Sequence, residues 1–218
     1  MSLLLVMHII CGGVGLATGA VALMMKKGSA RHVRYGLIMW YTMLAMAVSG
    51  IFLSFLTEIW VLLLTALMTI YLLLTGRNAL TRLSGKVNLE VKLWAGFNLL
   101  CLAVATAAGL SIIGAGDPSG GRFLGLAADS FIFALLDWRL IARGEAVGVD
   151  RVIDHLWRII GAMLFGCFAL FLFNPQAFPE WFIDMQFNLV PITIIIGVLI
   201  YWVVTLKWGR SIQKIAVH

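Results

Sequence analysis

The stretch that decides the fold covers residues 137–158 and reads DWRLIARGEAVGVDRVIDHLWR. It holds four arginines, four acidic residues and His155, one of only four histidines in the chain. Because only 12% of the sequence is charged, this interval stands out from its surroundings. Apolar runs long enough to cross a bilayer flank it on both sides. It therefore indicates a membrane boundary, either a plain cytoplasmic loop or the rim of a site.

The composition indicates an integral membrane protein. The chain has 218 residues, of which 62% are hydrophobic, and a mean hydropathy of +1.01. Soluble domains are typically about 45–50% apolar and about 25% charged. No stretch is long and polar enough to form a separate soluble domain, so we expect residues 1–218 to form a single transmembrane helical bundle. The net charge of +6 is the ordinary cationic excess of a membrane protein. The expected partner is the lipid bilayer, and no nucleic acid is expected.

Seven segments have the length and apolarity of transmembrane helices, which need roughly 20 mostly apolar residues. The predicted helices cover residues 2–25, 30–56, 59–76, 93–114, 123–141, 154–173 and 188–207. The predicted fold class is therefore all-α, a polytopic integral membrane protein with seven transmembrane helices. The loop over residues 175–187 mixes aromatic and acidic residues, which favours a short segment lying at the outer headgroup level.

The positive charges alternate between the predicted loops. Of the 16 Lys and Arg residues, 15 follow the first, third, fifth or seventh segment, and the other loops carry only Arg122. Cytoplasmic loops of membrane proteins carry an excess of Lys and Arg. The pattern therefore predicts a multi-pass protein with its amino terminus outside and its carboxyl terminus in the cytoplasm.

A first candidate site lies at the predicted cytoplasmic boundary, where three helix ends meet. Its residues are His32, Asp137, Arg139, His155 and Arg158. His155 and Arg158 are three residues apart and share a helix face. Neutral imidazoles with a carboxylate are ligands for zinc, iron or copper, so His32, His155 and Asp137 could bind a transition metal or haem. Arginine pairs suit phosphate or carboxylate groups. The alternative is a set of ion pairs, such as Asp137 with Arg158, that fixes helix ends.

A second candidate is a pair of polar residues near the outer side. His8 lies roughly 9 Å below the outer end of its helix, and Asp129 is expected at a similar depth in the fifth segment. Ionisable groups inside a bilayer are costly and tend to mark function. The pair could be a proton relay, a ligand group, or a polar contact between two helices. In the first segment, the Gly15/Gly19 spacing allows close helix packing, within the chain or in a homo-oligomer.

Several short motifs resemble a group of bacterial predicted membrane proteins of unknown function. They are His8-x-x-x-Gly12, Lys27-Gly28-x-x-x-His32, Asp137-x-Arg139 and His155-Leu-Trp-Arg158. The resemblance implies a multi-helix inner-membrane fold and no established activity. Some members of that group are distantly similar to small b-type cytochrome domains, in which membrane histidines bind haem. Carried over to this chain, that similarity implies haem b ligands among His8, His32 and His155, of which His32 and His155, on the predicted cytoplasmic side, could share one haem.

Three classes of function remain open from the sequence. The first is a redox or binding module with a metal or haem at the cytoplasmic boundary. The second is an ion-coupled transporter or small-molecule carrier that uses both candidate sites along one path. The third is a structural or accessory subunit of a membrane complex, in which the charged groups hold helix ends. An enzyme acting on lipid headgroups is a further alternative, for which the sequence supplies no nucleophile.

Overall fold

The computed structural model describes residues 3–82 and 85–215, and within them the secondary structure is helical apart from one isolated bridge between Lys86 and Glu145. The long helices are α1 (Leu3–Met24), α2 (Ala30–Thr57), α3 (Trp60–Thr81), α4 (Leu89–Gly114), α5 (Gly120–Arg143), α6 (Val149–Cys167) and α8 (Val190–Ile215). A π-helical turn, η1 (Phe168–Leu172), extends α6. Three short elements connect it to α8: η2 (Pro175–Ala177), α7 (Glu180–Asp184) and η3 (Phe187–Leu189).

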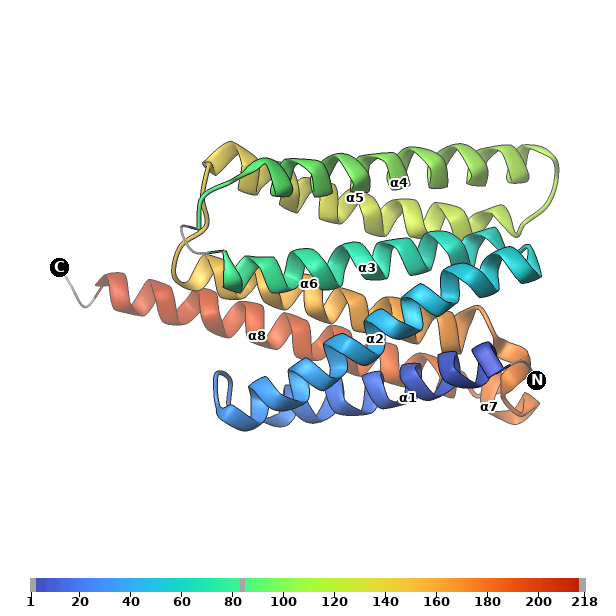
Figure 1. Cartoon of the computed structure of the whole chain (residues 1–218), viewed down its shortest axis with the longest axis horizontal. Coiled ribbons are helices and arrows are strands. Elements are labelled where there is room, and N and C mark those ends of the chain that lie inside the picture. The colour runs from blue at the N-terminus through green and yellow to red at the C-terminus, as the bar shows by residue number, and fades with distance from the viewer. Residues whose placement is uncertain (1–2, 83–84, 216–218) are drawn as a thin grey trace.

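The long helices lie side by side and run alternately in opposite directions, so the two termini lie at opposite ends of the bundle (Figure 1). The closest pairs are α1 with α2, α3 with α6, and α4 with α5. The α3–α6 pair forms the centre. The α1–α2 pair and the α4–α5 pair lie on opposite sides of it, and α8 packs on α6. We call the end where α1, α3, α5 and α8 finish the basic end, because its loops contain most of the Lys and Arg residues.

Within the described residues, six helices are long and apolar enough to cross a membrane. These are α1, α2, α3, α4, the continuous stretch Val149–Leu172 and the stretch Phe187–Gly209. The remaining long helix, α5, has the length of a span but carries five charged residues, Arg122, Asp129, Asp137, Arg139 and Arg143. The chain is thus an all-α, multi-pass protein by the length and composition of its helices.

The helix ends follow local capping chemistry. Ser29 caps α2, as expected, by accepting a hydrogen bond from the backbone N–H of His32, and Gly28 before it adopts a φ of +76°. Asn88 caps α4 in the same way, by accepting from the N–H of Val91 at 3.0 Å. The cap at Asn88 explains why α4 begins four residues before the predicted position at residue 93. The helix α3 likewise continues five residues beyond the predicted residue 76, to Thr81.

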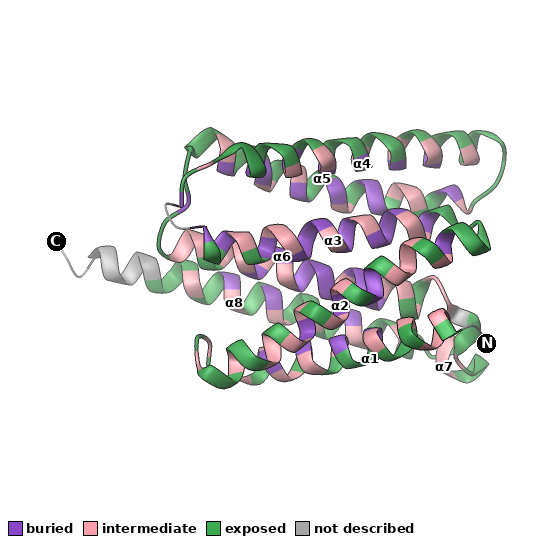
Figure 2. Cartoon of the chain, in the orientation of Figure 1, coloured by how far each residue is buried: buried purple, intermediate pink, exposed green. Residues whose placement is uncertain are grey.

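The core is built around three methionines of α2 that pack on three glycines of α1. A Cβ atom added to Gly12, Gly15 or Gly19 would meet Met46, Met43 or Met39 respectively, at 2.8 to 3.0 Å. All three methionines are buried, and burial is concentrated on the faces of α2, α3 and α6 that face one another (Figure 2). Packing within the chain therefore accounts for the Gly15/Gly19 spacing. A homo-oligomer through this face stays a prediction.

Two loops are joined at the basic end by backbone hydrogen bonds. The N–H of Val87 donates to the carbonyl of Gly144 at 2.7 Å, and the N–H of Ala146 donates to the carbonyl of Gly85 at 2.9 Å. The guanidinium of Arg151 donates to the carbonyls of Ala79, Leu80 and Arg82 at the end of α3. The charged interval that stands out in the sequence is thus fixed against the end of α3.

Candidate functional site

A buried polar network joins α3, α5 and α6 near the basic end. Arg158 donates from Nη2 to Asp137 Oδ1 at 2.6 Å and from Nε to Asp154 Oδ1 at 2.9 Å. Its Nη1 donates to Tyr71 Oη at 3.0 Å. The Tyr71 hydroxyl donates in turn to Asp137 Oδ2 at 2.6 Å. Arg158 is 1% exposed and Asp137 4% exposed, so both charges are almost completely removed from solvent.

Every charge in this network has a partner. Both oxygens of Asp137 accept a hydrogen bond, and three guanidinium nitrogens of Arg158 donate one. A buried ion pair must be fully hydrogen-bonded to offset the cost of desolvating it, and this one is. In the sequence analysis, an ion pair between Asp137 and Arg158 was the alternative to a metal site. Each oxygen of Asp137 is thus held by a donor within the chain, and a role for this residue as a metal ligand stays a prediction.

The two histidines of the first candidate site lie at the same end of the bundle. His155 Nδ1 lies 2.8 Å from the carbonyl oxygen of Gly76, and His32 Nδ1 lies 2.9 Å from that of Ala22. A carbonyl oxygen can only accept, so each Nδ1 carries its proton, and each Nε2 is left with a free lone pair. His32 lies in the first turn of α2 and His155 in the second turn of α6.

The rest of the predicted cytoplasmic site is not assembled around these histidines. Arg139 is exposed on α5, two residues beyond Asp137 and therefore on another face of the helix. Among residues 3–82 and 85–215, no three His, Cys, Asp or Glu side chains lie together as metal ligands would. The structure therefore brings together Asp137 with Arg158, and His32 with His155, as two separate pairs.

The predicted pair of His8 with Asp129 is not formed. His8 Nδ1 lies 3.1 Å from Ser49 Oγ on α2. Asp129 is half-buried on α5, and α1 and α5 lie on opposite sides of the α3–α6 pair (Figure 1). The sequence placed the two residues at a similar depth, but depth says nothing about the direction in which a helix face points. Each residue therefore has to be considered alone.

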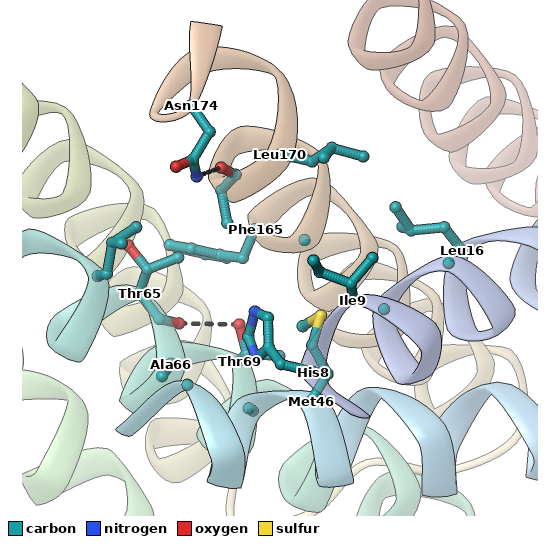
Figure 3. A pocket seen from close by; sticks show the side chains of 17 residues that line it. His8, Ile9, Leu16, Met46, Thr65, Ala66, Thr69, Phe165, Leu170 and Asn174 are labelled. Atoms are coloured by element: carbon teal, nitrogen blue, oxygen red, sulfur yellow. Dashed lines mark hydrogen bonds between the residues drawn. The ribbon is translucent and has the colours of Figure 1, made fainter. Parts of the chain in front are cut away.

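His8 lies in a cavity of about 140 Å³ between α1, α2, α3 and the extension of α6 (Figure 3). The wall contains many small residues, among them Gly12, Gly13, Ala47, Gly50, Ala66 and Gly166. Larger apolar side chains close the rest, with Phe165 facing the imidazole from α6 and Leu62, Leu16 and Met46 around it. The cavity exists because several helices present no side chain larger than a methyl group at this level.

The hydrogen bonds of Ser49 fix the tautomer of His8. The Ser49 hydroxyl uses its single hydrogen in a 2.9 Å bond to the carbonyl of Met46. Its oxygen then accepts, so His8 Nδ1 is the donor in the 3.1 Å contact. His8 Nε2 is left as an acceptor, and no described residue donates to it. Gly50 lets the ring lie flat against α2, because a Cβ there would meet the imidazole at 3.2 Å.

The two threonine hydroxyls of the cavity have used their donors, and the amide of Asn174 has used one of its two. Thr65 and Thr69 donate to the carbonyls of Val61 and Thr65, each at 2.8 Å. The amide of Asn174 donates to the carbonyl of Ala169 at 2.6 Å, which satisfies a carbonyl of the π-helical turn η1. Single π-helical turns are frequent at functional sites. The strongest acceptor of the cavity is therefore His8 Nε2, and the one side-chain donor left among these groups is the second N–H of the Asn174 amide.

The cavity and the buried network lie on different sides of the central helix pair. The cavity is on the side of α1 and α2, whereas Asp137 approaches from α5. Leu72 of α3, which is 0% exposed, lies against Gly161 of α6, where an added Cβ would meet it at 3.3 Å. This packed layer lies between the two groups of polar residues that a single transport path would have to connect.

Two functional features were missed by the sequence reasoning. Tyr71 was overlooked because only ionisable residues within the apolar runs were weighed, although a tyrosine in the middle of a span is itself a signal of a polar contact. The cavity at His8 was overlooked because it depends on small residues from four helices and on the π-helical turn. No short sequence motif identifies the contact of Tyr71 or the cavity at His8.

Comparison with known protein families, curated proteins and solved structures finds no match to this chain. The functional argument therefore rests on the geometry of the chain itself.

Proposed function

We propose that the protein crosses the bilayer seven times, with its amino terminus outside and its carboxyl terminus in the cytoplasm. The distribution of 15 of 16 Lys and Arg residues at the basic end supports this orientation. The seventh crossing is α5, which has 24 residues and is antiparallel to α4 along its length. Arg158 neutralises Asp137, and Arg139 and Arg143 lie in the last turns of α5 at the basic end, so Asp129 is the one unneutralised charge near the middle. The resemblance to bacterial membrane proteins favours the inner membrane.

Within this arrangement, we propose that the protein binds a small, lipid-soluble molecule in the cavity at His8. The observation that carries the proposal is the free Nε2 of His8 facing an apolar space of about 140 Å³. A protein cavity of about 150 Å³ can hold one benzene ring. Because His8 Nε2 is an acceptor, the ligand that fits it best donates a hydrogen bond, from a hydroxyl or an N–H. The cavity lies near the amino-terminal end of α1, which is the outer side in the proposed orientation. The ligand therefore reaches it from the outer side. A small-molecule carrier or sensor fits this description.

The test of this proposal uses phenol and toluene, two probes of nearly equal size of which only phenol donates a hydrogen bond. We expect the purified full chain to bind phenol roughly tenfold more tightly than toluene, because one net hydrogen bond distinguishes them. The replacement His8→Phe should abolish that preference while keeping a ring in place. Binding is measured as the ligand-induced shift of the thermal unfolding midpoint in one detergent.

A cavity-filling variant separates specific binding from partitioning into detergent. Gly13 lines the cavity, and a Cβ there meets nothing within 4 Å, so Gly13→Phe can place a ring in the space without a clash at Cβ. Gly96 on α4 is equally unobstructed, and Gly96→Phe serves as the matched control. We expect Gly13→Phe to lose the midpoint shifts that phenol and toluene cause, and Gly96→Phe to keep both. Equal shifts in the two variants would rule out the cavity as the binding site.

A second candidate is the binding of haem or a metal ion by His32 and His155. The specific observation in its favour is that a backbone carbonyl fixes Nδ1 of each ring and leaves both Nε2 atoms free, which is the usual arrangement of histidine ligands. Haem supplies four further nitrogen ligands and redox chemistry when bound, and a bare ion needs ligands beyond these two rings. The chain's own contribution is to hold the two imidazoles in the correct tautomer.

Absorption spectroscopy and elemental analysis test the second candidate. Protein purified from cells supplied with haem precursor and trace metals should carry a Soret band or a stoichiometric metal, and His155→Ala should remove it. The control is His8→Phe, which changes a histidine outside this pair. A preparation that carries neither haem nor metal under these conditions contradicts the candidate.

A further inference from the structure

A second cavity, of about 260 Å³, lies at the basic end of the bundle on the surface of α3, between α2 and α4. Trp40 of α2 and Trp94 of α4 line it from the two sides, and Arg77 and Asn78 of α3 lie between them. Glu90, in the first turn of α4, completes the rim. We call this space the tryptophan crevice. It combines two aromatic walls with one cation and one anion.

The cation of the crevice has its donors free. The guanidinium of Arg77 stacks over Trp40, with its central carbon 4.7 Å from the ring centroid. Arg77 is exposed, and its side chain makes no hydrogen bond or ion pair with any residue that the structure describes. Stacking on a ring face fixes the plane of the guanidinium while its N–H groups stay available at the edge. A planar edge of N–H donors is the arrangement that binds a phosphate group.

The anion of the crevice is also only partly used. Glu90 Oε2 accepts a hydrogen bond from Asn78 Nδ2 at 2.9 Å, which fixes the carboxylate beside α3. Glu90 is exposed, and its second oxygen accepts no hydrogen bond from any described residue. Trp94 lines the same cavity, and the face of a tryptophan ring attracts cations. A carboxylate oxygen beside an aromatic wall suits a primary ammonium group.

We propose that the tryptophan crevice binds the headgroup of an aminophospholipid, with the phosphate on Arg77 and the ammonium on Glu90 beside Trp94. Phosphoethanolamine carries these two charges on one short link. The crevice lies near helix ends and contains two tryptophans. Tryptophan is enriched at the membrane–water interface, which is the level of the lipid headgroups. Leu74 in the crevice, with exposed Leu93 nearby on α4, offers an apolar path for an acyl chain. This proposal does not rest on the cavity at His8, which is formed by other residues.

The chemistry predicts a defined lipid preference. A phosphatidylglycerol headgroup has the phosphate but brings no cation to Glu90. A phosphatidylcholine headgroup has both charges, but its quaternary ammonium cannot donate a hydrogen bond to a carboxylate. We therefore expect phosphatidylethanolamine to bind about tenfold more tightly than either, the difference that one charge-assisted hydrogen bond makes.

The experiment measures lipid retention by native mass spectrometry on the full chain, released from nanodiscs that contain equal amounts of the three phospholipids. Arg77→Gln should reduce retention of phosphatidylethanolamine and phosphatidylglycerol alike, because it removes the phosphate partner. Glu90→Gln should reduce only phosphatidylethanolamine and leave phosphatidylglycerol equal or higher. Arg34→Gln and Glu145→Gln remove charges of the same sign at the basic end, outside the crevice, and should change nothing.

Two outcomes overturn the proposal. The first is a wild-type chain that retains the three lipids equally, or an Arg77→Gln variant that behaves like Arg34→Gln. The second concerns the source of the headgroup: soluble phosphoethanolamine, added at the concentration of the lipid, should not displace it, because it lacks the acyl chains. Displacement under those conditions would identify a free phosphoethanolamine-type metabolite as the ligand instead of a lipid. Neither result bears on phenol binding at His8, so the two proposals fail independently.

Discussion

Replacement of Arg158 by methionine is expected to destabilise the bundle by about 3–5 kcal/mol, because it leaves the Asp137 carboxylate buried without a cation. Asp137 is 4% exposed, and its hydrogen-bond partners are Arg158 and Tyr71. The hydroxyl of Tyr71 stays bonded to Asp137, but a neutral donor does not offset a buried charge. The measurement is the free energy of unfolding of the full chain in mixed micelles, titrated with a denaturing detergent.

The control for this prediction is another arginine at the same end of the bundle. Arg143 lies 3.9 Å from Asp150, and its side chain is 55% exposed. Exposed ion pairs contribute at most about 1 kcal/mol, so Arg143→Met should have little effect on the free energy of unfolding. Equal losses for Arg158→Met and Arg143→Met would contradict the description of the network as a buried, mutually dependent group.

A triple variant shows whether the network has a role beyond stability. Replacing Asp137, Arg158 and Tyr71 together with Leu, Met and Phe removes the buried partners at once, and the one network charge that remains is Asp154, whose side chain is 15% exposed. Hydrophobic replacement of a whole buried ion pair is often neutral or stabilising. We expect the triple variant to recover most of the stability that Arg158→Met loses. A stable triple variant that also keeps phenol binding assigns the network a purely structural role.

The second large effect is expected at Gly85, where Gly85→Ala should cost about 2–4 kcal/mol. Gly85 has a φ of +67°, in the left-handed region that residues with a Cβ avoid. A Cβ there would also collide with the carbonyl oxygen of Ala146. The residue lies in the hydrogen-bonded contact between the two loops at the basic end, so relief of the clash has to separate them.

Gly28→Ala isolates the backbone contribution at a comparable site. Gly28 has a φ of +76°, but a Cβ there meets nothing within 4 Å. The free energy of unfolding of Gly28→Ala should therefore fall by only about 1–2 kcal/mol, which is the cost of placing a residue with a Cβ in the left-handed conformation. The thermal unfolding midpoints of Gly85→Ala and Gly28→Ala are compared. The difference between them measures the effect of the collision with the carbonyl of Ala146. If the two midpoints coincide, the two loops are not held together as the structure indicates.

The sequence predicted an all-α chain of long helices because the signals that set the helices are local. Apolar length marks six of the long helices, and Ser29 and Gly28 mark a helix junction whose capping the structure contains. The predicted end of α3 was wrong by five residues, because Arg77 and Arg82 suggested a loop. The structure continues the helix through them, with Arg82 Nη1 donating to Asn78 Oδ1 one turn earlier at 3.1 Å. Polar residues at the end of a span can thus belong to the helix itself.

The candidate sites were only partly predictable, because they depend on which faces of the helices meet. Asp137 and Arg158 could be matched from the sequence, since both are charges near the same end of the bundle. His8 and Asp129 could not be placed correctly, because their similar depth carried no information on direction around the helix axis. The partner of His8 is Ser49, a small hydroxyl that one sequence cannot distinguish from many others.

The charge on α5 has a consequence for how the protein is made. A segment with two aspartates and three arginines is a poor substrate for insertion into the membrane by itself, since each charge near the centre of a helix costs about 2.5–3.5 kcal/mol. The helix that neutralises Asp137 is α6, which is synthesised later. During biogenesis α5 is therefore expected to wait at the translocation machinery, in contact with α4, until Arg158 has emerged from the ribosome.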